Sequence, residues 1–402
     1  MNDTSNPLLF QLRIDRLAYG GDGIARLPDG MTAFVPGALP GELVEAEVIL
    51  KKRNFARCRL HRIIETSPER IEAQCPYFFT PAHGENFCPG CTWLHLSYQD
   101  EIRYKQEQFA SFLLRDDLIE ASAIMAPAAS AERFGMRNKL KLSRGDNGYG
   151  YYRQDNETVI SVSDCLLAAK EIRQEIADLH KNNNSPQVTL RQTAKDGVIV
   201  CSGTDAPGRV LTETLGDFGE FQVSETGFFQ TNIQMATLLT GRVVSLLKEN
   251  GCRKLLELYC GVGVFSIAAA GAIPQLCSTG VEVNPAAIAS AKINAANHKV
   301  SERCRFFAAD AARWLKKERK RLQYDSVLID PPRSGMAKDA LETLAAARIP
   351  NIIYVSCAPD TLRRDLLRLR EYGYHAATSG MLDMFPGTAH FESVTLLKLK
   401  NF

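Results

Sequence analysis

From about residue 226 onward, short apolar runs alternate with segments of helical pattern. Runs rich in β-branched and large apolar residues predict buried strands at 254–259, 278–283, 304–308, 324–329 and 352–356. The segments between them, such as 285–296, predict helices. Strands that alternate with helices form parallel sheets covered on both faces. The pattern therefore predicts a doubly wound α/β sheet, whose ligands would bind at the carboxyl ends of the strands.

The first 66 residues follow a different pattern. Short alternating runs are separated by Gly20, Gly21 and Gly23 and by Pro-Gly turns at 36–37 and 40–41, which predicts a small β-barrel. A β-rich region follows, with a helical pattern at 98–115. We expect the charged face of this helix to be solvated; it consists of Glu101, Arg103, Lys105 and Glu107. We expect three domains, namely 1–66, 67–225 and 226–402, with the 97–115 helix packing against the last.

Composition narrows the class of protein. A net charge of +2 places any affinity for nucleic acid in local patches rather than in the whole chain. The start has no basic segment followed by an apolar core, and the uncharged stretch 258–281 is interrupted by glycine and proline. We therefore expect a cytoplasmic monomer without a membrane span, and eleven cysteines that are mostly free thiols.

One local patch is basic. The segment 48–62 contains Phe55 and no acid, and its basic residues are Lys51, Lys52, Arg53, Arg57, Arg59 and Arg62. On a small barrel, such a stripe with an exposed aromatic is typical of an RNA-contact surface. From charge alone, a solvated basic face is the simpler explanation of the same residues.

Three cysteines share one loop. Cys75, Cys88 and Cys91 lie among prolines and glycines, a common layout for metal ligands. The fourth ligand could be His83, His95 or the distant Cys165. A histidine would favour zinc, whereas four thiolates would suit either zinc or a [4Fe–4S] cluster.

The first strand of the α/β region ends in a turn of the kind that binds nucleotides. Tyr259 precedes Gly261 and Gly263, and Ser266 stands where a dinucleotide-binding motif has a third glycine or alanine. S-Adenosylmethionine has no pyrophosphate and does not need that small residue. Acids at the next two strand ends, Glu282 and Asp310, would suit the ribose hydroxyls and the adenine. The spacing favours an adenosine cofactor.

The last two strands provide the reactive groups. Asp330-Pro-Pro is followed by Arg333 rather than by the aromatic residue of amino-directed methyltransferases. Cys357 directly follows a predicted strand at 351–356. It precedes a helix for which we predict Asp360 as the N-cap. The helix N-terminus, with Arg363 and Arg364, would favour a thiolate. A structural cysteine is the alternative interpretation.

A nucleophilic thiol requires a base. A thiolate that forms a covalent adduct with its substrate needs a base that later removes a proton, so that the thiol can leave. Glu392 is our candidate for that base. His390 is a rival because of its ordinary pKa.

Several motifs resemble those of a known family. GGDGIARLPDGMTAFVPGALPGELVEAEV resembles a TRAM domain, which binds RNA. The motifs FQTN (229–232), LLELYCGVGVFS, DPPRSG, VSCAP and FPGTAHFE resemble, in order and spacing, those of the RNA 5-methyluridine (uracil-C5) methyltransferases, including the 23S rRNA enzymes. The resemblance covers nearly the whole chain. The sequence departs from the family in Ala358, which replaces the usual Asn, and in a longer gap between Cys75 and Cys88.

The resemblance implies a role for each matching residue. Cys357 would be the nucleophile and Glu392 the base, with Gln230, Tyr259, Glu282 and Asp330 around S-adenosylmethionine. The [4Fe–4S] ligands would be Cys75, Cys88, Cys91 and Cys165. The substrate would be a uridine in RNA, with rRNA favoured over tRNA. Two alternatives stay open: a catalytically inactive iron–sulfur RNA-binding protein, and a cytosine-5 or amino-directed RNA methyltransferase.

Overall fold

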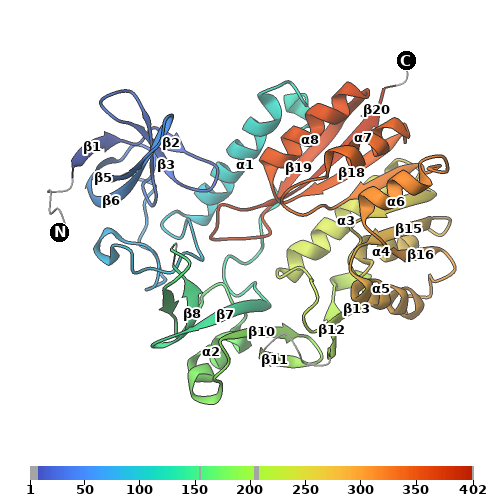
Figure 1. Cartoon of the computed structure of the whole chain (residues 1–402), viewed down its shortest axis with the longest axis horizontal. Coiled ribbons are helices and arrows are strands. Elements are labelled where there is room, and N and C mark those ends of the chain that lie inside the picture. The colour runs from blue at the N-terminus through green and yellow to red at the C-terminus, as the bar shows by residue number, and fades with distance from the viewer. Residues whose placement is uncertain (1–7, 154, 203–207, 401–402) are drawn as a thin grey trace. The chain divides into compact units, whose positions relative to one another are not determined.

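The computed structural model describes residues 8–153, 155–202 and 208–400 (Figure 1). The chain forms two compact units. The first contains the residues up to 108, 141–188 and 385–389, and the second contains 109–140, 189–384 and 390–402. Within the described ranges, no helix combines the length and apolar character needed to cross a membrane.

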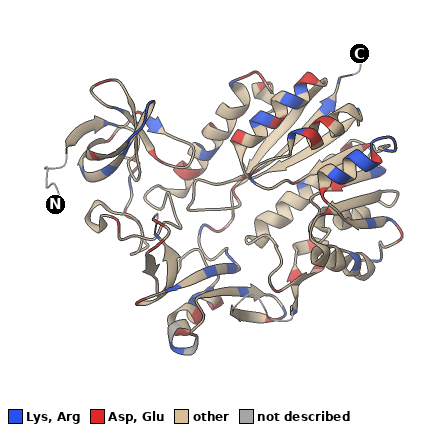
Figure 2. Cartoon of the chain, viewed as in Figure 1, with Lys and Arg blue, Asp and Glu red and all other residues tan. Residues whose placement is uncertain are grey.

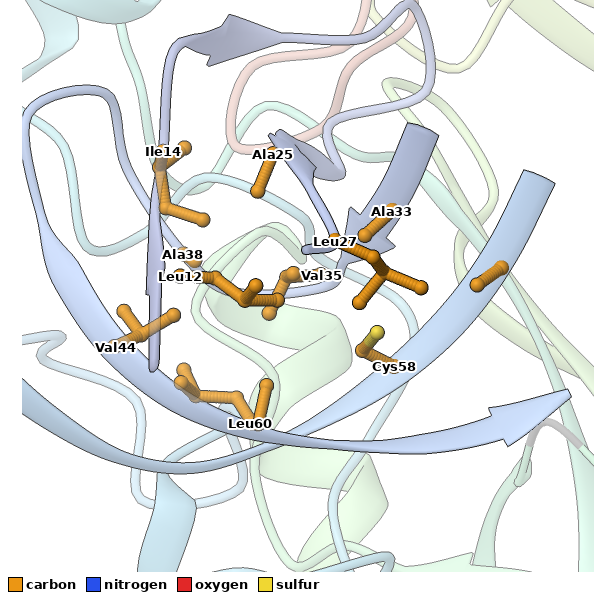
Figure 3. Packing of buried hydrophobic residues seen from close by; sticks show 12 residues of the cluster. Leu12, Ile14, Ala25, Leu27, Ala33, Val35, Ala38, Val44, Cys58 and Leu60 are labelled. Carbon is orange, nitrogen blue, oxygen red and sulfur yellow. The ribbon is translucent and has the colours of Figure 1, made fainter. Parts of the chain in front are cut away.

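The first unit begins with a six-stranded sheet. Its strands are β1 Leu9–Arg13, β2 Arg16–Leu17, β3 Gly23–Arg26, β4 Thr32–Val35, β5 Leu43–Lys51 and β6 Phe55–Glu65, in the spatial order β1-β5-β6-β4-β3-β2. All neighbours pair antiparallel except β4 and β6, which run parallel. Alternate residues face inward, and Leu12, Val35, Val44 and Leu60 pack together inside (Figure 3). The strand-rich N-terminal region is as predicted.

The rest of the first unit is loop-rich. After the short 3₁₀ turn η1 Pro81–His83, helix α1 Tyr98–Leu114 runs from this unit into the second. Strands β7 Lys139–Gly145, β8 Gly148–Tyr152 and β9 Val159–Ser161 pair antiparallel, and helix α2 Lys170–Asn182 follows.

Arg103 and Glu107 on the charged face of α1 are exposed as we predicted, but the prediction does not hold for Glu101 and Lys105. The side chains of Glu101 and Lys105 are 0% exposed, and Lys105 Nζ lies 2.7 Å from Glu101 Oε1. Their spacing of four residues is usual for exposed helix pairs. The prediction is wrong because neighbouring segments, which helical periodicity does not reveal, cover this part of the helix.

The second unit is built around one seven-stranded sheet. Its strands are β14 Lys254–Leu258, β15 Cys277–Glu282, β16 Cys304–Ala308, β17 Ser326–Ile329, β18 Asn351–Ser356, β19 Tyr374–Leu382 and β20 Glu392–Leu399. Its helices are α3 Ile233–Glu249, α4 Val264–Ala272, α5 Pro285–Asn297, α6 Ala311–Glu318, α7 Lys338–Ala346 and α8 Pro359–Glu371. The remaining elements are η2 Ala121–Ala123, β10 Gln187–Thr193, β11 Gly197–Ser202, β12 Val210–Thr214, η3 Gly216–Phe218 and β13 Glu220–Ser224.

The sheet has the spatial order β16-β15-β14-β17-β18-β20-β19. Helices α3, α4 and α5 contact one another in series, as do α6, α7 and α8, so two helical layers flank the sheet (Figure 1). Strands β14 to β18 are parallel, and every residue of β17 is buried, as a strand covered on both faces requires. The predicted α/β class is confirmed.

Two details differ from the prediction. The sheet is mixed rather than parallel, because β20 pairs antiparallel with both β18 and β19. The N-cap of α8 is Ala358 rather than Asp360, which lies in the first turn of the helix. Pro359 occupies the first helical position, where its fixed φ suits a helix start, and this shifts the cap back by two residues.

Candidate active site

The turn between β14 and α4 needs unusual backbone angles. Tyr259, Gly261 and Gly263 all have positive φ, of 64°, 52° and 84°. A Cβ on Gly263 would lie 2.9 Å from Cζ of Phe306, so a larger residue does not fit. The two glycines thus let the chain reverse sharply above the end of β14.

Ser266 has a role in this turn. Its backbone N–H donates to Glu257 Oε2 at 2.9 Å, and its hydroxyl hydrogen-bonds the same oxygen. Burial raises the pKa of Glu257 to about 8, although the Ser266 hydrogen bonds oppose this shift. A glycine at position 266 would leave a buried carboxyl without its hydroxyl partner.

A pocket of about 550 Å³ opens beside this turn. Four of the predicted cofactor residues line it: Gln230, Tyr259, Gly261 and Asp330. The remaining lining is mostly apolar and comprises Leu215, Phe228, Phe229, Ala236, Leu239, Thr240, Glu257, Cys260, Val262, Val264 and Phe265. The lining, mostly apolar and aromatic with a few polar groups, suits a ligand that joins a flat base to a polar sugar. Sequence reasoning missed Phe228, which is 74% exposed, although two successive aromatics before Gln230 could have indicated it.

Glu282 and Asp310 do not line this pocket. Glu282 accepts hydrogen bonds from the backbone N–H groups of Gly261 at 3.3 Å and Asn284 at 2.9 Å. Asp310 lies beyond the end of β16, and its side chain caps α6 by accepting from Arg313 N at 3.0 Å. Both carboxylates nevertheless act on Tyr259, because burial first and then Asp310 raise the pKa of that phenol to about 12, with a smaller contribution from Glu282.

Cys357 and Glu392 stand opposite each other. In the antiparallel ladder of β18 and β20, Ser356 is the partner of Ser393, so the next position brings Cys357 level with Glu392. Cys357 itself is half-buried. We predicted a strand at 394–397 but not its antiparallel direction, and it is this direction that brings Cys357 and Glu392 together.

The thiol of Cys357 does not have the lowered pKa that we predicted. Burial, followed by the negative charges of Glu392 and Asp330, raises it to about 11, and only Arg333 acts in the other direction among nearby charges. The two arginines that we expected to favour the thiolate already form ion pairs: Arg363 pairs with Asp116 at 2.5 Å, and Arg364 pairs with Asp365 at 2.8 Å. The free protein thus holds Cys357 as a thiol at neutral pH.

The two acids beside Cys357 are also perturbed. Burial raises the pKa of Asp330 to about 7. Burial and the neighbouring charge of Asp330 raise the pKa of Glu392 well above its usual value. Glu392 Oε2 is buried and has no hydrogen-bond partner among the described residues. An acid in this state is suited to take up a proton. The rival, His390, is half-buried.

The pKa of Cys357 predicts how its reactivity depends on pH. Below pH 11 the thiolate fraction rises about tenfold for each pH unit. We expect iodoacetamide to alkylate Cys357 about ten times faster at pH 9 than at pH 8. Peptide mass spectrometry of the free protein measures that rate. A plateau over this range would show that the thiol ionises at a lower pH.

The Gly263 turn gives a second prediction. Gly263→Ala should lower the free energy of unfolding by about 1–3 kcal/mol, through strain at positive φ and the close approach to Phe306. It should also weaken binding of S-adenosylhomocysteine. Urea denaturation and calorimetry measure these effects. Gly271→Ala is the matched control, because Gly271 lies inside α4 with no neighbour within 4 Å of its missing Cβ. Equal losses in both variants would contradict the prediction.

The four cysteines proposed as metal ligands all belong to the first unit and are half-buried. Burial raises the pKa of Cys75, and the charge of Cys165 contributes to this. Tyr77 links the two segments, because its hydroxyl lies 2.7 Å from Ser163 Oγ and its carbonyl accepts from Cys88 N at 2.8 Å.

These residues do not form a metal site as they stand. Within the described part of the chain, no three His, Cys, Asp or Glu side chains are grouped so as to hold a metal ion. Of the two histidines that we considered, His83 has its Nδ1 2.9 Å from Phe78 O, and His95 is buried with its ring 5.2 Å from that of Phe78. The metal ligands remain a prediction.

The basic segment of the barrel is largely paired with acids. Arg57 pairs with Asp22, Arg59 with Glu47 and Glu85, Arg62 with Glu45, and Lys51 with Asp29. Figure 2 shows acidic as well as basic positions in this part of the chain. Phe55 is half-buried against Phe34, with ring centroids 5.7 Å apart, and is not the exposed aromatic that we predicted. Lys52 and Arg53 are exposed in the β5–β6 turn and form no ion pair with any described residue.

The sheet order, the glycine turn and the pocket at the strand ends define the class of S-adenosylmethionine-dependent methyltransferase folds. Comparisons with known proteins then identify the domains. Residues 216–400 match the family described as tRNA (Uracil-5-)-methyltransferase, and residues 10–60 match the TRAM domain. The chain thus contains one region similar to the TRAM domain and a second, C-terminal region similar to the tRNA (Uracil-5-)-methyltransferase family.

Relatives match the chain along its whole length. A protein of Halalkalibacterium halodurans named an uncharacterized RNA methyltransferase is 28% identical, with 98% of this chain and 97% of the relative covered. The 23S rRNA (uracil(1939)-C(5))-methyltransferase RlmD of Shewanella amazonensis is 27% identical, with 97% and 96% covered. The crystal structure of Pyrococcus abyssi tRNA (uracil-54, C5)-methyltransferase with S-adenosyl-L-homocysteine has a TM-score of 0.74 at 23% identity, covering 96% of this chain and all of that one. This likeness confirms the fold.

Proposed function

We propose that this chain transfers a methyl group from S-adenosylmethionine to carbon 5 of a uridine in RNA. One observation carries the proposal: Asp330 lines the pocket beside the glycine turn and also acts electrostatically on both Cys357 and Glu392. Asp330 therefore links the pocket to the thiol of Cys357 and to Glu392, the proposed proton acceptor. The domain composition and the relatives named RNA methyltransferases support the same substrate class.

The residues divide the reaction between them. Cys357, once deprotonated, adds to carbon 6 of uracil, and the electrons of the carbon 5–carbon 6 double bond move onto the enolate. S-Adenosylmethionine would supply the electrophilic methyl group that carbon 5 attacks, and S-adenosylhomocysteine would leave with the electron pair of the broken sulfur–methyl bond. Glu392 then removes the proton from carbon 5, the double bond re-forms, and the Cys357 thiolate leaves. Because the pKa of Cys357 is raised in the free protein, removal of the thiol proton adds to the free-energy barrier of the first step.

The proposed cofactor contacts follow from the pocket and its turn. S-Adenosylmethionine would be held directly, or through the shape of the turn between β14 and α4, by Gln230, Tyr259, Gly261, Gly263 and Asp330. Glu282 and Asp310 would meet the ribose and adenine, as the negative charge that both place near Tyr259 suggests. Calorimetry with S-adenosylhomocysteine on Glu282→Gln and Asp310→Asn tests this part of the proposal.

An incubation with RNA containing 5-fluorouridine tests the mechanism. Fluorine at carbon 5 cannot be removed as a proton, so we expect a stable covalent complex between Cys357 and the RNA. Mass spectrometry of nuclease digests of normal RNA should find 5-methyluridine. Methylated cytosine or a methylated exocyclic amine would instead support the cytosine-5 or amino-directed alternative. Arg333, which replaces an aromatic after Asp330-Pro-Pro, argues against the amino-directed class.

We propose rRNA as the substrate. Its support is the set of full-length relatives named 23S rRNA (uracil(1939)-C(5))-methyltransferase, at 27–29% identity. The structural neighbour named as a tRNA enzyme makes tRNA the competitor. Transfer of a tritiated methyl group to rRNA and tRNA transcripts, compared side by side, decides between them. Preferential labelling of tRNA would overturn the rRNA proposal.

The barrel would bind the RNA backbone, and the tip of the β5–β6 turn gives a prediction. Replacing Lys52 and Arg53 together by Gln should weaken RNA binding at low salt. It should also reduce the slope of log K against log salt by about one to two units. Fluorescence anisotropy at several salt concentrations measures both quantities. Lys195→Gln is the control, because Lys195 is exposed but already paired with Glu220 at 2.5 Å. An unchanged slope would show that the turn makes no phosphate contact.

We also propose that Cys75, Cys88, Cys91 and Cys165 hold a [4Fe–4S] cluster. The proximity of Cys75 to Cys165 and the Tyr77–Ser163 link support this, because they bring the distant fourth cysteine to the loop. The cluster takes no part in the proposed methyl transfer. Iron and acid-labile sulfide should be present in anaerobically purified protein and absent from Cys165→Ser. Stoichiometric zinc without sulfide would show the alternative metal.

A further inference from the structure

The loop Phe385–Ala389 leads directly into Glu392. It belongs to the first unit, whereas the residues from His390 onward belong to the second. Inside the first unit, two side chains of helix α1 hold its backbone. The N–H of Gly387 donates to Glu101 Oε1 at 2.7 Å, and Lys105 Nζ donates to the carbonyl of Phe385 at 3.2 Å. A buried ion pair is thus hydrogen-bonded to the first residue and to the middle residue of one short loop.

Other contacts hold the same loop in place. The N–H groups of Thr92 and Trp93 both donate to the carbonyl of Gly387, at 2.8 and 3.1 Å. Gly387 has φ of +78°, and a Cβ there would lie 3.0 Å from Leu94 Cδ2. Ala389 is buried in one apolar cluster with Leu17, Leu39, Trp93, Leu96 and Tyr104. The first unit therefore leaves the loop little freedom.

The next part of the chain contacts the same helix. In the second unit, Phe391 packs edge-to-face on Phe109, with ring centroids 5.8 Å apart. Phe109 lies one turn beyond Lys105 on α1. Helix α1 thus contacts the chain on the N-terminal side of Glu392 through Glu101 and Lys105, and at the adjacent residue through Phe109.

The energetics suggest that the ion pair has a purpose other than stability. Two charges with fully buried side chains carry a large desolvation penalty, and apolar residues of similar size are often as stabilising or more so. The pair does what apolar residues cannot, because it satisfies a backbone amide and a carbonyl of a loop that has no ladder partner at these positions.

We infer that Glu101 and Lys105 are positioning residues for the proton acceptor Glu392. They fix the loop from which Glu392 enters β20, and so set where its carboxyl group stands. This inference rests on the proposed function, in which Glu392 acts only after the covalent adduct has formed. Loss of the pair should therefore slow release of the adduct while leaving adduct formation intact.

Two double variants separate positioning from stability. Glu101→Leu with Lys105→Met removes the buried charges and both loop hydrogen bonds. Glu101→Gln with Lys105→Met also removes the charges but keeps an amide oxygen for the N–H of Gly387. Glu107→Gln is the control on the same helix, because it breaks only the exposed pair with Arg103. Each protein is incubated with normal RNA and, separately, with 5-fluorouridine RNA.

We expect the Leu/Met variant to trap 5-fluorouridine RNA at the wild-type rate. With normal RNA it should accumulate a covalent adduct carrying the transferred methyl group, because release is slowed roughly tenfold to a hundredfold. The Gln/Met variant should fall between it and the wild type, and Glu107→Gln should match the wild type. Thermal melting and S-adenosylhomocysteine binding report whether the variants are folded.

Two results would overturn the inference. Wild-type release from the Leu/Met variant would show that the pair does not position Glu392. Equal losses of trapping, cofactor binding and melting temperature would show a purely structural pair. Failure of the wild-type protein to trap 5-fluorouridine RNA is a different result, because it overturns the proposed function itself and the inference with it.

Discussion

Cys357→Ala is expected to abolish methyl transfer to RNA, by roughly 10⁴-fold or more, because no other group can form the bond to carbon 6. Binding of S-adenosylhomocysteine should change little, since Cys357 does not line the cofactor pocket. Tritium transfer from labelled S-adenosylmethionine measures the first quantity, and calorimetry measures the second. The same variant should fail to trap 5-fluorouridine RNA.

Cys277→Ser is the matched control, because Cys277 is an exposed cysteine in β15 of the same sheet. It should keep full activity. Methylation by Cys357→Ala at the wild-type rate would exclude the covalent mechanism. Absence of methyl transfer from the wild type as well, on every RNA tried, would favour the alternative of an inactive RNA-binding protein.

Glu392→Gln is expected to stop the reaction at a later stage. The variant should form the adduct and transfer the methyl group, but without a proton acceptor it should release product roughly 10²–10⁴-fold more slowly. A covalent protein–RNA complex carrying the labelled methyl group should then accumulate on ordinary uridine RNA. Denaturing gels show it as a labelled band of reduced mobility.

His390→Gln tests the rival base. His390 is two residues from Glu392 and half-buried, so both variants disturb the same stretch of chain. If the adduct accumulates in His390→Gln and not in Glu392→Gln, the roles of the two residues are reversed. Accumulation in neither variant would place the proton acceptor elsewhere, and Asp330 would be the next residue to test.

The sequence predicted the sheet because its strands are buried on both faces. The run Asn351–Ser356 is a strand with the predicted bounds, and β16 also begins and ends as predicted. Continuous apolar runs bounded by polar turns are the strongest local signal of such strands. The glycine turn was recognisable for a similar reason, since Gly261 and Gly263 both require positive φ.

What sequence reasoning missed came from contacts between distant segments. It predicted a lowered pKa for Cys357 from the nearby helix and arginines, yet burial, followed by the charges of Glu392 and Asp330, raises that pKa. It expected Glu101 and Lys105 to be solvated, because helical spacing does not show which other segment covers a face. The sequence also did not predict the antiparallel direction of β20. The order and direction of strands depend on which strands pair, and a local sequence pattern does not show this.

Strand β20 lies between β18 and β19 although it follows both in the chain. During synthesis, β19 therefore emerges from the ribosome before the strand that must separate it from β18. Until β20 inserts, the nucleophile has no acid opposite it, and the proposed adduct could form but not resolve. A nascent chain halted before residue 392 would therefore be unable to complete the proposed reaction cycle. Activity would begin only after the last strand of the sheet has been made.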